Sequence, residues 1–444
     1  MTAEGSQRFD PALPCRFVAG RYRRSAGAKR AVIDPATLAV AGWTAETTPA
    51  EVEAALDTAI AAQRDWAALD AKSRASVLHA LADRLAAADH RRTAELMTRE
   101  TGKPYPEALG ELANCASVFR YYAEMARDEA GKVAGSTPPG SFQYARYEPL
   151  GISVHILPFN FPVLLLCWTV AASLAAGNAC IVKPAEAATL STLDVMRCFA
   201  DLPDGLIACL PGGPELGRAL VASERTHAVA FTGSVAVARE VAAAAGAALK
   251  PAVIEAGGSD ALIVLADAPV DIAAAGAVTA AFHLSGQVCT AAERLFVEDA
   301  VYDAFMAAFV ERTERLRIGN GLEQSEIGPL VSEAARARVM RLVTDALGQG
   351  RGSSPAGGCH PGSRRAGSTR LPSSATAGPR WRSCRRSASG RWPPCRGSAA
   401  SRRRSSGPMP PASASVPRSS RPAWPRPCRP PSGWRPVSSG STTR

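Results

Sequence analysis

The spacing of apolar residues changes along the chain and predicts two kinds of structure. Over residues 49–66, 72–92 and 106–127 apolar positions recur at helical intervals, which is typical of helices with one buried face. From residue 151 onward, short runs that are apolar throughout alternate with helical stretches. The expected strands are 152–157, 179–182, 206–210, 228–231, 252–255 and 261–265. The expected helices between them are 163–176, 189–200, 214–223 and 235–244.

This alternation predicts an α/β fold. Strands that are apolar over their whole length are covered on both faces, and the helices between them indicate a parallel sheet. Residues 131–148 combine turn residues with the alternating segment FQYARYEP, which predicts a small hairpin. Ligands bind at the carboxyl ends of the strands in such parallel sheets. We therefore expect the functional residues at those ends.

Composition changes abruptly at Gly350. Residues 351–444 contain no Asp, Glu, Lys, Ile, Phe or Tyr, and all 19 of their charged residues are Arg. Residues 1–350 hold 32 basic and 40 acidic side chains, a net charge of −8. Residues 351–444 carry +19, so they alone make the charge of the whole chain positive, at +11. A segment so rich in Pro, Gly and Ser cannot bury enough apolar surface to offset the entropy of ordering. We expect residues 351–444 to be disordered.

The body of the chain sets bounds on the class of protein. Its 350 residues exceed the roughly 100–200 of one typical domain, which favours two domains. The first residues, MTAEGSQRFD, lack the apolar core of a signal peptide. The apolar stretch 161–176 is interrupted by Pro162 and falls short of the roughly 20 residues of a membrane span. We expect a cytoplasmic protein without membrane contact. Its seven cysteines lack the spacing of a zinc site, so free thiols and no metal are expected.

Three polar residues are candidates for catalysis. Cys289, in SGQVCTAAERLFV, suits a nucleophile, although a lone cysteine in an apolar body more often belongs to the core. Glu255, in VIEAGG, ends an expected buried strand, where a carboxylate is costly unless paired or functional; a surface-loop glutamate is the alternative. Asn160, in LPFNFP, is bracketed by prolines that would fix its amide as an oxyanion donor. A turn asparagine is the alternative.

Four further residues suggest a dinucleotide. Lys183 and Glu186, in IVKPAE, could reach a ribose or phosphate, or could form a solvated pair. Gly233 and Ser234, in FTGSVAVARE, end a strand and open a helix whose unpaired N–H groups suit a pyrophosphate. The pattern differs from the GxGxxG fingerprint, so alone it only suggests a phosphate site.

The order of these motifs resembles the aldehyde dehydrogenase superfamily. PFNFP, GNACIVKPAE, PGG, FTGS, E-x-GG and GQVC follow one another over residues 158–289. The resemblance extends from Asp34 to Gly350 and includes IDPATL, ETGKP and IGPLVS. Ala256 replaces a usual Leu, and Ala238 stands where the family often has a second Gly. Neither departure removes a reacting group.

The resemblance implies oxidation of an aldehyde to a carboxylic acid with NAD, and with NADP as a possible substitute. Cys289 would attack the carbonyl, Asn160 and the Cys289 backbone N–H would hold the oxyanion, and Glu255 would activate the water that hydrolyses a thioester. Glu186 favours NAD because its charge should repel a 2′-phosphate. The cofactor-binding residues implied are Pro158, Phe159, Lys183, Glu186, Gly233 and Ser234.

The resemblance also divides the chain. Residues 1–130 and 149–255 correspond to a Rossmann-type NAD(P)-binding domain, 131–148 to an oligomerisation hairpin, and 256–350 to an incomplete catalytic domain. The family pattern should continue past Gly350 with a Glu-Glu-x-Phe-Gly-Pro-Val segment, which residues 351–444 lack. The family forms homo-oligomers, and the absence of this segment makes the same assembly doubtful for this chain.

The tail permits the missing pattern in another reading frame. In that frame, each codon consists of the third base of one codon and the first two bases of the next. The sequence permits Ala-Arg-Val/Leu-Leu-Ala-Gly-Gly there from residue 350 to 357, and Glu-Glu-x-Phe-Gly-Pro-Val within 380–393. Trp381 and Trp392 have single codons and anchor the frame. We expect residues 351–444 to be aldehyde dehydrogenase coding sequence read one base out of frame, and the chain to have little or no activity.

Two other functions fit parts of the sequence. Taken at face value, the Arg-rich tail would indicate a nucleic-acid-binding protein. The shifted frame explains the tail without that function, so we expect no nucleic-acid partner. A non-catalytic family member is a third possibility, against which the joint presence of Cys289, Glu255 and Asn160 speaks. The expected substrate is a small aldehyde whose identity the motifs leave open.

Overall fold

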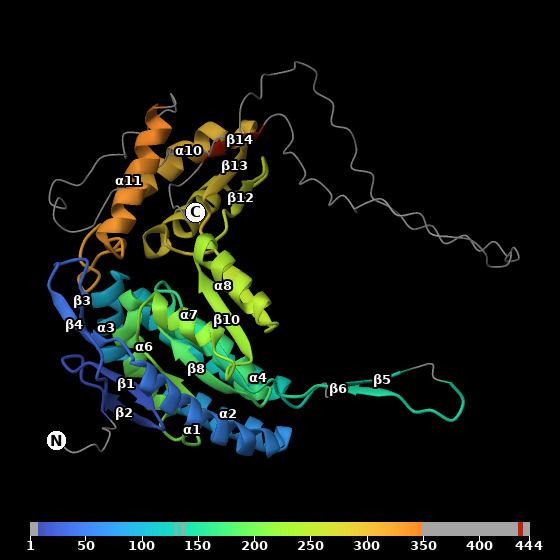
Figure 1. Cartoon of the computed structure of the whole chain (residues 1–444). Helices are drawn as coiled ribbons and strands as arrows, with labels where there is room; N and C mark the ends of the chain where they lie inside the picture. Colours follow the sequence, from blue (N-terminus) through green and yellow to red (C-terminus); the bar gives the residue numbers. More distant parts are fainter. Residues whose placement is uncertain (1–7, 129–130, 135–137, 349–433, 438–444) are drawn as a thin grey trace, which may run out of the picture.

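The structure is a computed structural model that describes residues 8–128, 131–134, 138–348 and 434–437. Figure 1 shows a larger body built on one sheet, a smaller body beside it, and a hairpin that projects from the larger one. Within the described residues, no helix is long and apolar enough to cross a bilayer. The same residues contain no group of three or more His, Cys, Asp or Glu side chains placed to hold a metal ion.

The larger body, which we call the seven-stranded region, comprises residues 8–128 and 149–256. Across the described residues its sheet has the order β11-β10-β7-β8-β9-β1-β2. The first five strands in that order are parallel, whereas β1 and β2 pair antiparallel with their neighbours. The strands are β1 (Cys15–Val18), β2 (Arg21–Arg24), β7 (Ile152–Ile156), β8 (Ala179–Lys183), β9 (Ile207–Cys209), β10 (Ala228–Gly233) and β11 (Ala252–Ala256).

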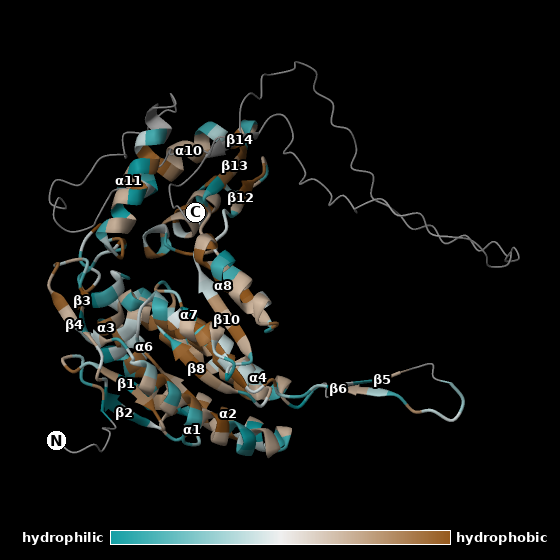
Figure 2. Cartoon of the chain, in the orientation of Figure 1, coloured by the Kyte–Doolittle hydropathy of each residue, from teal (hydrophilic) through white to brown (hydrophobic). Residues whose placement is uncertain are grey.

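Helices cover this sheet and bury its central strands. Helices α1 and α5 pack against β7 and β8, and α2 and α4 pack against α5. All five residues of β8 are buried as a result, and Figure 2 shows hydrophobic residues along the strands between the helices. The helices are α1 (Pro49–Ala68), α2 (Ala71–Ala87), α3 (Arg91–Thr101), α4 (Tyr105–Met125), α5 (Pro162–Ala175), α6 (Thr189–Val195), α7 (Pro214–Ala222) and α8 (Val235–Ala247), with short 3-10 turns η1 (Glu186–Ala188) and η2 (Met196–Phe199).

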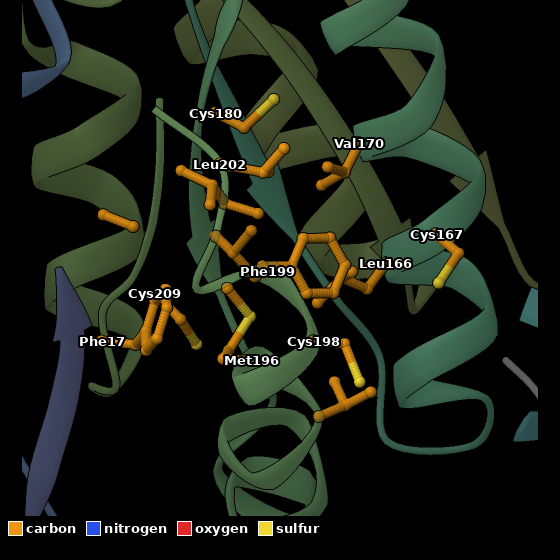
Figure 3. Close-up of a cluster of buried hydrophobic side chains, with 14 of the residues drawn as sticks. Phe17, Leu166, Cys167, Val170, Cys180, Met196, Cys198, Phe199, Leu202 and Cys209 are labelled. Atoms are coloured by element: carbon orange, nitrogen blue, oxygen red, sulfur yellow. The ribbon is translucent and has the colours of Figure 1, made fainter. Parts of the chain in front are cut away.

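The core of this region joins residues from distant parts of the chain. Figure 3 shows Phe17 of β1, Leu166 of α5 and Phe199 of η2 among the side chains of one buried cluster. The ring of Phe199 meets Phe119 edge-on, with 5.8 Å between the centroids. The strands predicted over 152–157, 179–182, 206–210, 228–231 and 252–255 are confirmed as β7, β8, β9, β10 and β11.

Local sequence sets the helix ends. Thr48 and Glu51 form a capping box at the start of α1, and Asp70 caps α2. The helix predicted over 72–92 is too long, because α2 ends at Ala87 and a separate helix, α3, begins at Arg91. Four short strands near the N-terminus were missed, because each has only four to six residues and β2 and β3 also carry several basic side chains: β1, β2, β3 (Lys29–Ile33) and β4 (Val40–Ala45).

The smaller body, which we call the three-stranded region, comprises residues 261–348 and 434–437. Strand β12 (Ala261–Val264) pairs parallel with β13 (Arg294–Glu298), and β14 (Trp434–Val437) pairs antiparallel with β13. The expected strand 261–265 is thus present, but in a second sheet. The helical elements are α9 (Val270–Phe282), η3 (His283–Gly286), α10 (Asp299–Glu314) and α11 (Glu333–Gly348).

Two predictions concern segments at the margins of these bodies. The predicted hairpin is present as β5 (Gly131–Val133) paired with β6 (Tyr144–Arg146), while its role in oligomerisation stays a prediction. Within the tail, β14 is a strand, which the expectation of disorder did not foresee. The rest of that expectation, and the Arg-rich residues behind the nucleic-acid alternative, lie outside the described residues.

Candidate active site

Neighbouring parallel strands end at one edge of the seven-stranded sheet. Strand β7 runs into Pro158, Phe159 and Asn160, β8 ends at Lys183, and β10 ends at Gly233. Because β10, β7 and β8 lie side by side in parallel register, these ends are adjacent. The structure therefore brings the predicted oxyanion donor and predicted cofactor residues to the edge where parallel sheets bind ligands.

Asn160 is held by two hydrogen bonds. Its Oδ1 accepts from the Phe161 N–H at 3.0 Å, and its Nδ2 donates to the Gln287 carbonyl at 2.9 Å. Gln287 lies two residues before Cys289, so the Asn160 amide is joined directly to the cysteine loop. A primary amide carries two N–H donors, and the bond to Gln287 uses one of them.

Cys289 lies in a turn after η3 and is exposed, whereas the other described cysteines are all buried. Burial raises the pKa of the Cys15 and Cys180 thiols to about 12. A nucleophilic cysteine must be accessible and able to form a thiolate. Among the described thiols, Cys289 alone meets the first condition, and it does not belong to the core.

The backbone before Cys289 is strained. Leu284 (φ 48°), Ser285 (φ 57°) and Gly286 (φ 75°) are left-handed in succession, a conformation that costs a non-glycine residue about 1–2 kcal/mol. Hydrogen bonds hold it in place: the Leu284 N–H donates to Glu107 Oε2 at 3.1 Å, and Ser285 Oγ donates to the Gly328 carbonyl at 2.8 Å. Such strain persists only where the surroundings impose it, so the cysteine loop has a fixed shape.

Charged residues in and just before α4 support both the Asn160 segment and the cysteine loop. Lys103 and Glu111 form a fully buried ion pair, and Glu111 Oε1 accepts the N–H groups of Val163 and Leu164 at 2.9 Å each. These two N–H groups belong to the first turn of α5. Burial raises the pKa of the Glu107 carboxyl to about 7, against the influence of Lys103. The motifs gave no role to these residues, although Lys103 lies within ETGKP.

Glu255 lies on an edge strand, so the expectation of a buried strand end is wrong. The sheet ends at β11, and the Glu255 side chain is exposed. The loop after it approaches the cysteine: a Cβ added at Gly258 would lie 3.7 Å from the Cys289 carbonyl oxygen. The E-x-GG loop therefore runs beside the cysteine turn, with Glu255 three residues before the point of approach.

The predicted phosphate and ribose residues lie at the ends of β8 and β10. Lys183 is buried, and its ammonium donates to the Pro184 carbonyl at 3.1 Å. Burial lowers the pKa of Lys183 to about 8, while Glu46 acts in the opposite direction. Ser234 caps α8, because its Oγ accepts from the Val237 N–H at 3.4 Å. The hydroxyl thus orders the helix start that was predicted to face a pyrophosphate.

A charged network surrounds Glu186, and the sequence did not reveal it. Arg30, on β3, forms ion pairs with Glu186 and, at 2.6 Å, with Glu46 at the end of β4. Glu46 Oε2 also accepts the Gly213 N–H at 2.8 Å. Arg30 and Glu46 lie more than 130 positions before Glu186, on short strands without a recognisable motif. Only the fold brings them together.

Comparison with known proteins places this geometry in a family. The aldehyde dehydrogenase family model matches residues 22–368. A betaine aldehyde dehydrogenase from Cereibacter sphaeroides is 37% identical over 350 residues, which is 77% of this chain and 71% of that protein.

Solved structures agree with that match. PnpE from Pseudomonas sp. WBC-3 has a TM-score of 0.76 and 30% identity over 81% of this chain and 75% of its own, and PnpE has also been solved in complex with nicotinamide adenine dinucleotide. An NADP dependent enzyme from E. coli has a TM-score of 0.76 and 29% identity over 83% of this chain and 76% of its own. The chain belongs to the aldehyde dehydrogenase family.

Proposed function

We propose that this site oxidises an aldehyde to a carboxylic acid through a covalent intermediate on Cys289. The observation that carries the proposal is an exposed cysteine in a loop that is hydrogen-bonded to the Asn160 amide. The thiolate adds to the carbonyl carbon, and the carbonyl oxygen becomes an oxyanion. The second N–H of Asn160 and the backbone N–H of Cys289 would stabilise that charge.

The remaining steps release the acid. A nicotinamide cofactor, when bound, would supply the hydride acceptor. Cys289 would hold the carbon as a thiohemiacetal before the hydride leaves and as a thioester afterwards. Glu255, the exposed first residue of the E-x-GG segment on β11, takes a proton from water, whose oxygen attacks the thioester carbon. The carbon–sulfur bond then breaks, and the acid leaves as the thiolate re-forms.

The residues at the strand ends fit NAD or NADP. A Cβ added at Gly213 would lie 3.5 Å from Glu186 Oε1, and one added at Gly217 would lie 3.5 Å from Lys183 Cδ, so two glycines adjoin these side chains. The start of α8, with Ser234 exposed, offers N–H groups to a pyrophosphate. Pro158 and Phe159, at the end of β7, would line the same edge.

We infer that the reading frame is lost at Gly350 and that this chain turns over poorly or not at all. Support comes from the family motifs that the shifted frame of residues 351–444 permits. In this proposal the NAD(P)-binding domain is residues 1–130 and 149–255, the hairpin 131–148 serves oligomerisation, and residues 256–350 form part of a catalytic domain. Location in the cytoplasm stays a prediction.

A frame-corrected chain tests the chemistry. We expect it to reduce NAD or NADP in the presence of an aldehyde, with betaine aldehyde as the first of a substrate panel because of the relative's name. Cys289→Ala should abolish turnover, and Glu255→Gln should let the thioester accumulate as a mass increase on the Cys289 peptide. Turnover by the Cys289→Ala variant would refute the proposal.

A further inference from the structure

We propose that Arg30 determines how well the cofactor site accepts NADP, by offsetting the negative charge that Glu186 presents to a 2′-phosphate. The inference rests on the proposed use of a dinucleotide. It concerns a residue on β3 that belongs to none of the motifs at the strand ends.

The geometry places Arg30 between two carboxylates. Its guanidinium pairs with Glu186 on one side and with Glu46 at 2.6 Å on the other. Glu46 is fixed in turn, because it accepts the Gly213 N–H at 2.8 Å. A Cβ added at Gly213 would lie 3.4 Å from Arg30 Nη2 and 3.5 Å from Glu186 Oε1. One small residue, Gly213, thus adjoins all three charged side chains.

The charges in this subsite balance. Arg30 and Lys183 carry positive charge, and Glu46 and Glu186 carry negative charge. The Lys183 pKa of about 8 leaves that residue mostly protonated at pH 7. A lone Glu186 would repel a 2′-phosphate, which carries close to two negative charges at neutral pH. With Arg30 paired to it, Glu186 no longer presents an uncompensated charge.

Removal of Arg30 should therefore discriminate between the two cofactors. Without it, Glu46 and Glu186 face Lys183 alone, and the subsite gains one net negative charge. The adenine ribose of NAD is neutral, so the change falls mainly on NADP. A unit charge about 6 Å from a phosphate dianion in a water-like medium is worth about tenfold in affinity, and salt reduces it. The Arg30 and Glu186 side chains are about two-fifths exposed, so solvent weakens the interaction and we expect a change in relative affinity of about threefold to tenfold.

The experiment measures binding by calorimetry with the full 444-residue chain, which requires no turnover. Dissociation constants for NAD and NADP are compared in the wild type, Arg30→Gln and Arg30→Lys. We expect Arg30→Gln to raise the NADP to NAD ratio of dissociation constants about threefold to tenfold, and Arg30→Lys to keep the wild-type ratio. The effect should shrink in 0.5 M KCl.

Two further variants sharpen the result. Glu186→Gln should lower the same ratio. Lys29→Gln is the matched control, because Lys29 is the preceding residue on β3 and its ammonium lies over the Trp43 ring at 3.8 Å. An unchanged ratio in Arg30→Gln, or an equal change in Lys29→Gln, would overturn the role of Arg30. Failure of the wild type to bind either dinucleotide would instead refute the proposed function.

Discussion

The two regions of this chain differ in how completely they bury their strands. In the seven-stranded region, every residue of β8 is buried beneath packed helices. In the three-stranded region, Ile263 on β12 is 61% exposed and Ile272 on α9 is 71% exposed. The edge strand β11 of the seven-stranded region resembles them, with Val253 62% exposed. Exposed apolar side chains on edge strands mark surfaces that require a covering partner. The centre of the seven-stranded region thus contains its own packing partners, whereas its edge strand β11 and the three-stranded region present apolar surface that we expect further chain to cover.

The largest change in stability is expected for a substitution in the core of the seven-stranded region. Phe199→Ala should lower the free energy of unfolding by about 3–5 kcal/mol, because it opens a cavity beside Phe119. Urea unfolding followed by circular dichroism would measure the change. Phe142→Ala, at a position 74% exposed next to β6, is the control and should change stability by less than about 0.5 kcal/mol. Similar costs for the two variants would contradict the packing described for Phe199.

A second test addresses the buried Lys103–Glu111 ion pair beneath the first turn of α5. Lys103→Met should cost about 3 kcal/mol, because Glu111 would keep its charge in a fully buried position without its partner. Adding Glu111→Gln removes that charge and should recover part of the loss. Unfolding curves of the single and double variants give the comparison. A double variant no more stable than Lys103→Met alone would show that the buried charge is not the cause.

The pH dependence of Glu107 gives a smaller effect with a defined sign. Its pKa is raised by burial from 4.5 to about 7, so between these values the folded chain keeps a proton that the unfolded chain has released. Its contribution to stability is complete below pH 4.5 and is lost as pH rises through 7, by at most about 1.4 kcal/mol per pH unit. Lys103 and His283 are the charged or titratable neighbours that face it.

Glu107→Gln removes this titration while keeping an acceptor for the Leu284 N–H. The variant should therefore gain stability relative to the wild type between pH 5.5 and pH 7.5. Urea unfolding of both chains at the two pH values measures the difference. If the free energies of unfolding of the two chains differ by the same amount at pH 5.5 and at pH 7.5, Glu107 does not titrate in this window.

The smallest expected change in stability concerns the exposed apolar surface. Ile263→Lys and Ile272→Lys should alter the free energy of unfolding by less than about 0.5 kcal/mol, because both side chains already face solvent. The double variant should nevertheless remain soluble at a higher concentration than the wild type, as sedimentation would show. Unchanged solubility would weaken the view that this surface lacks its cover.

The features that the sequence predicted are those marked by a local pattern of residues, and the features that it missed depend on contacts between distant residues. The central strands and the helices between them carry their signal in local apolar runs, and Cys289, Asn160 and Glu255 lie in motifs. Arg30 and Glu107 act through partners more than 150 positions away, so no local pattern marks them. The left-handed backbone at Leu284 is equally hidden, because bulky residues rarely adopt it. The exposure of Glu255 reflects the position of β11 at the sheet edge, which periodicity does not report.

The central claim is that one aldehyde dehydrogenase chain loses its reading frame at Gly350, which leaves the second region uncovered. The nucleotide sequence from the Gly350 codon to the stop codon tests this most directly. We predict that the frame shifted by one base stays open through the codons of residues 351–444 and encodes Glu-Glu-x-Phe-Gly-Pro-Val across codons 380–393. Early stop codons in that frame, or other residues at this segment, would contradict the claim.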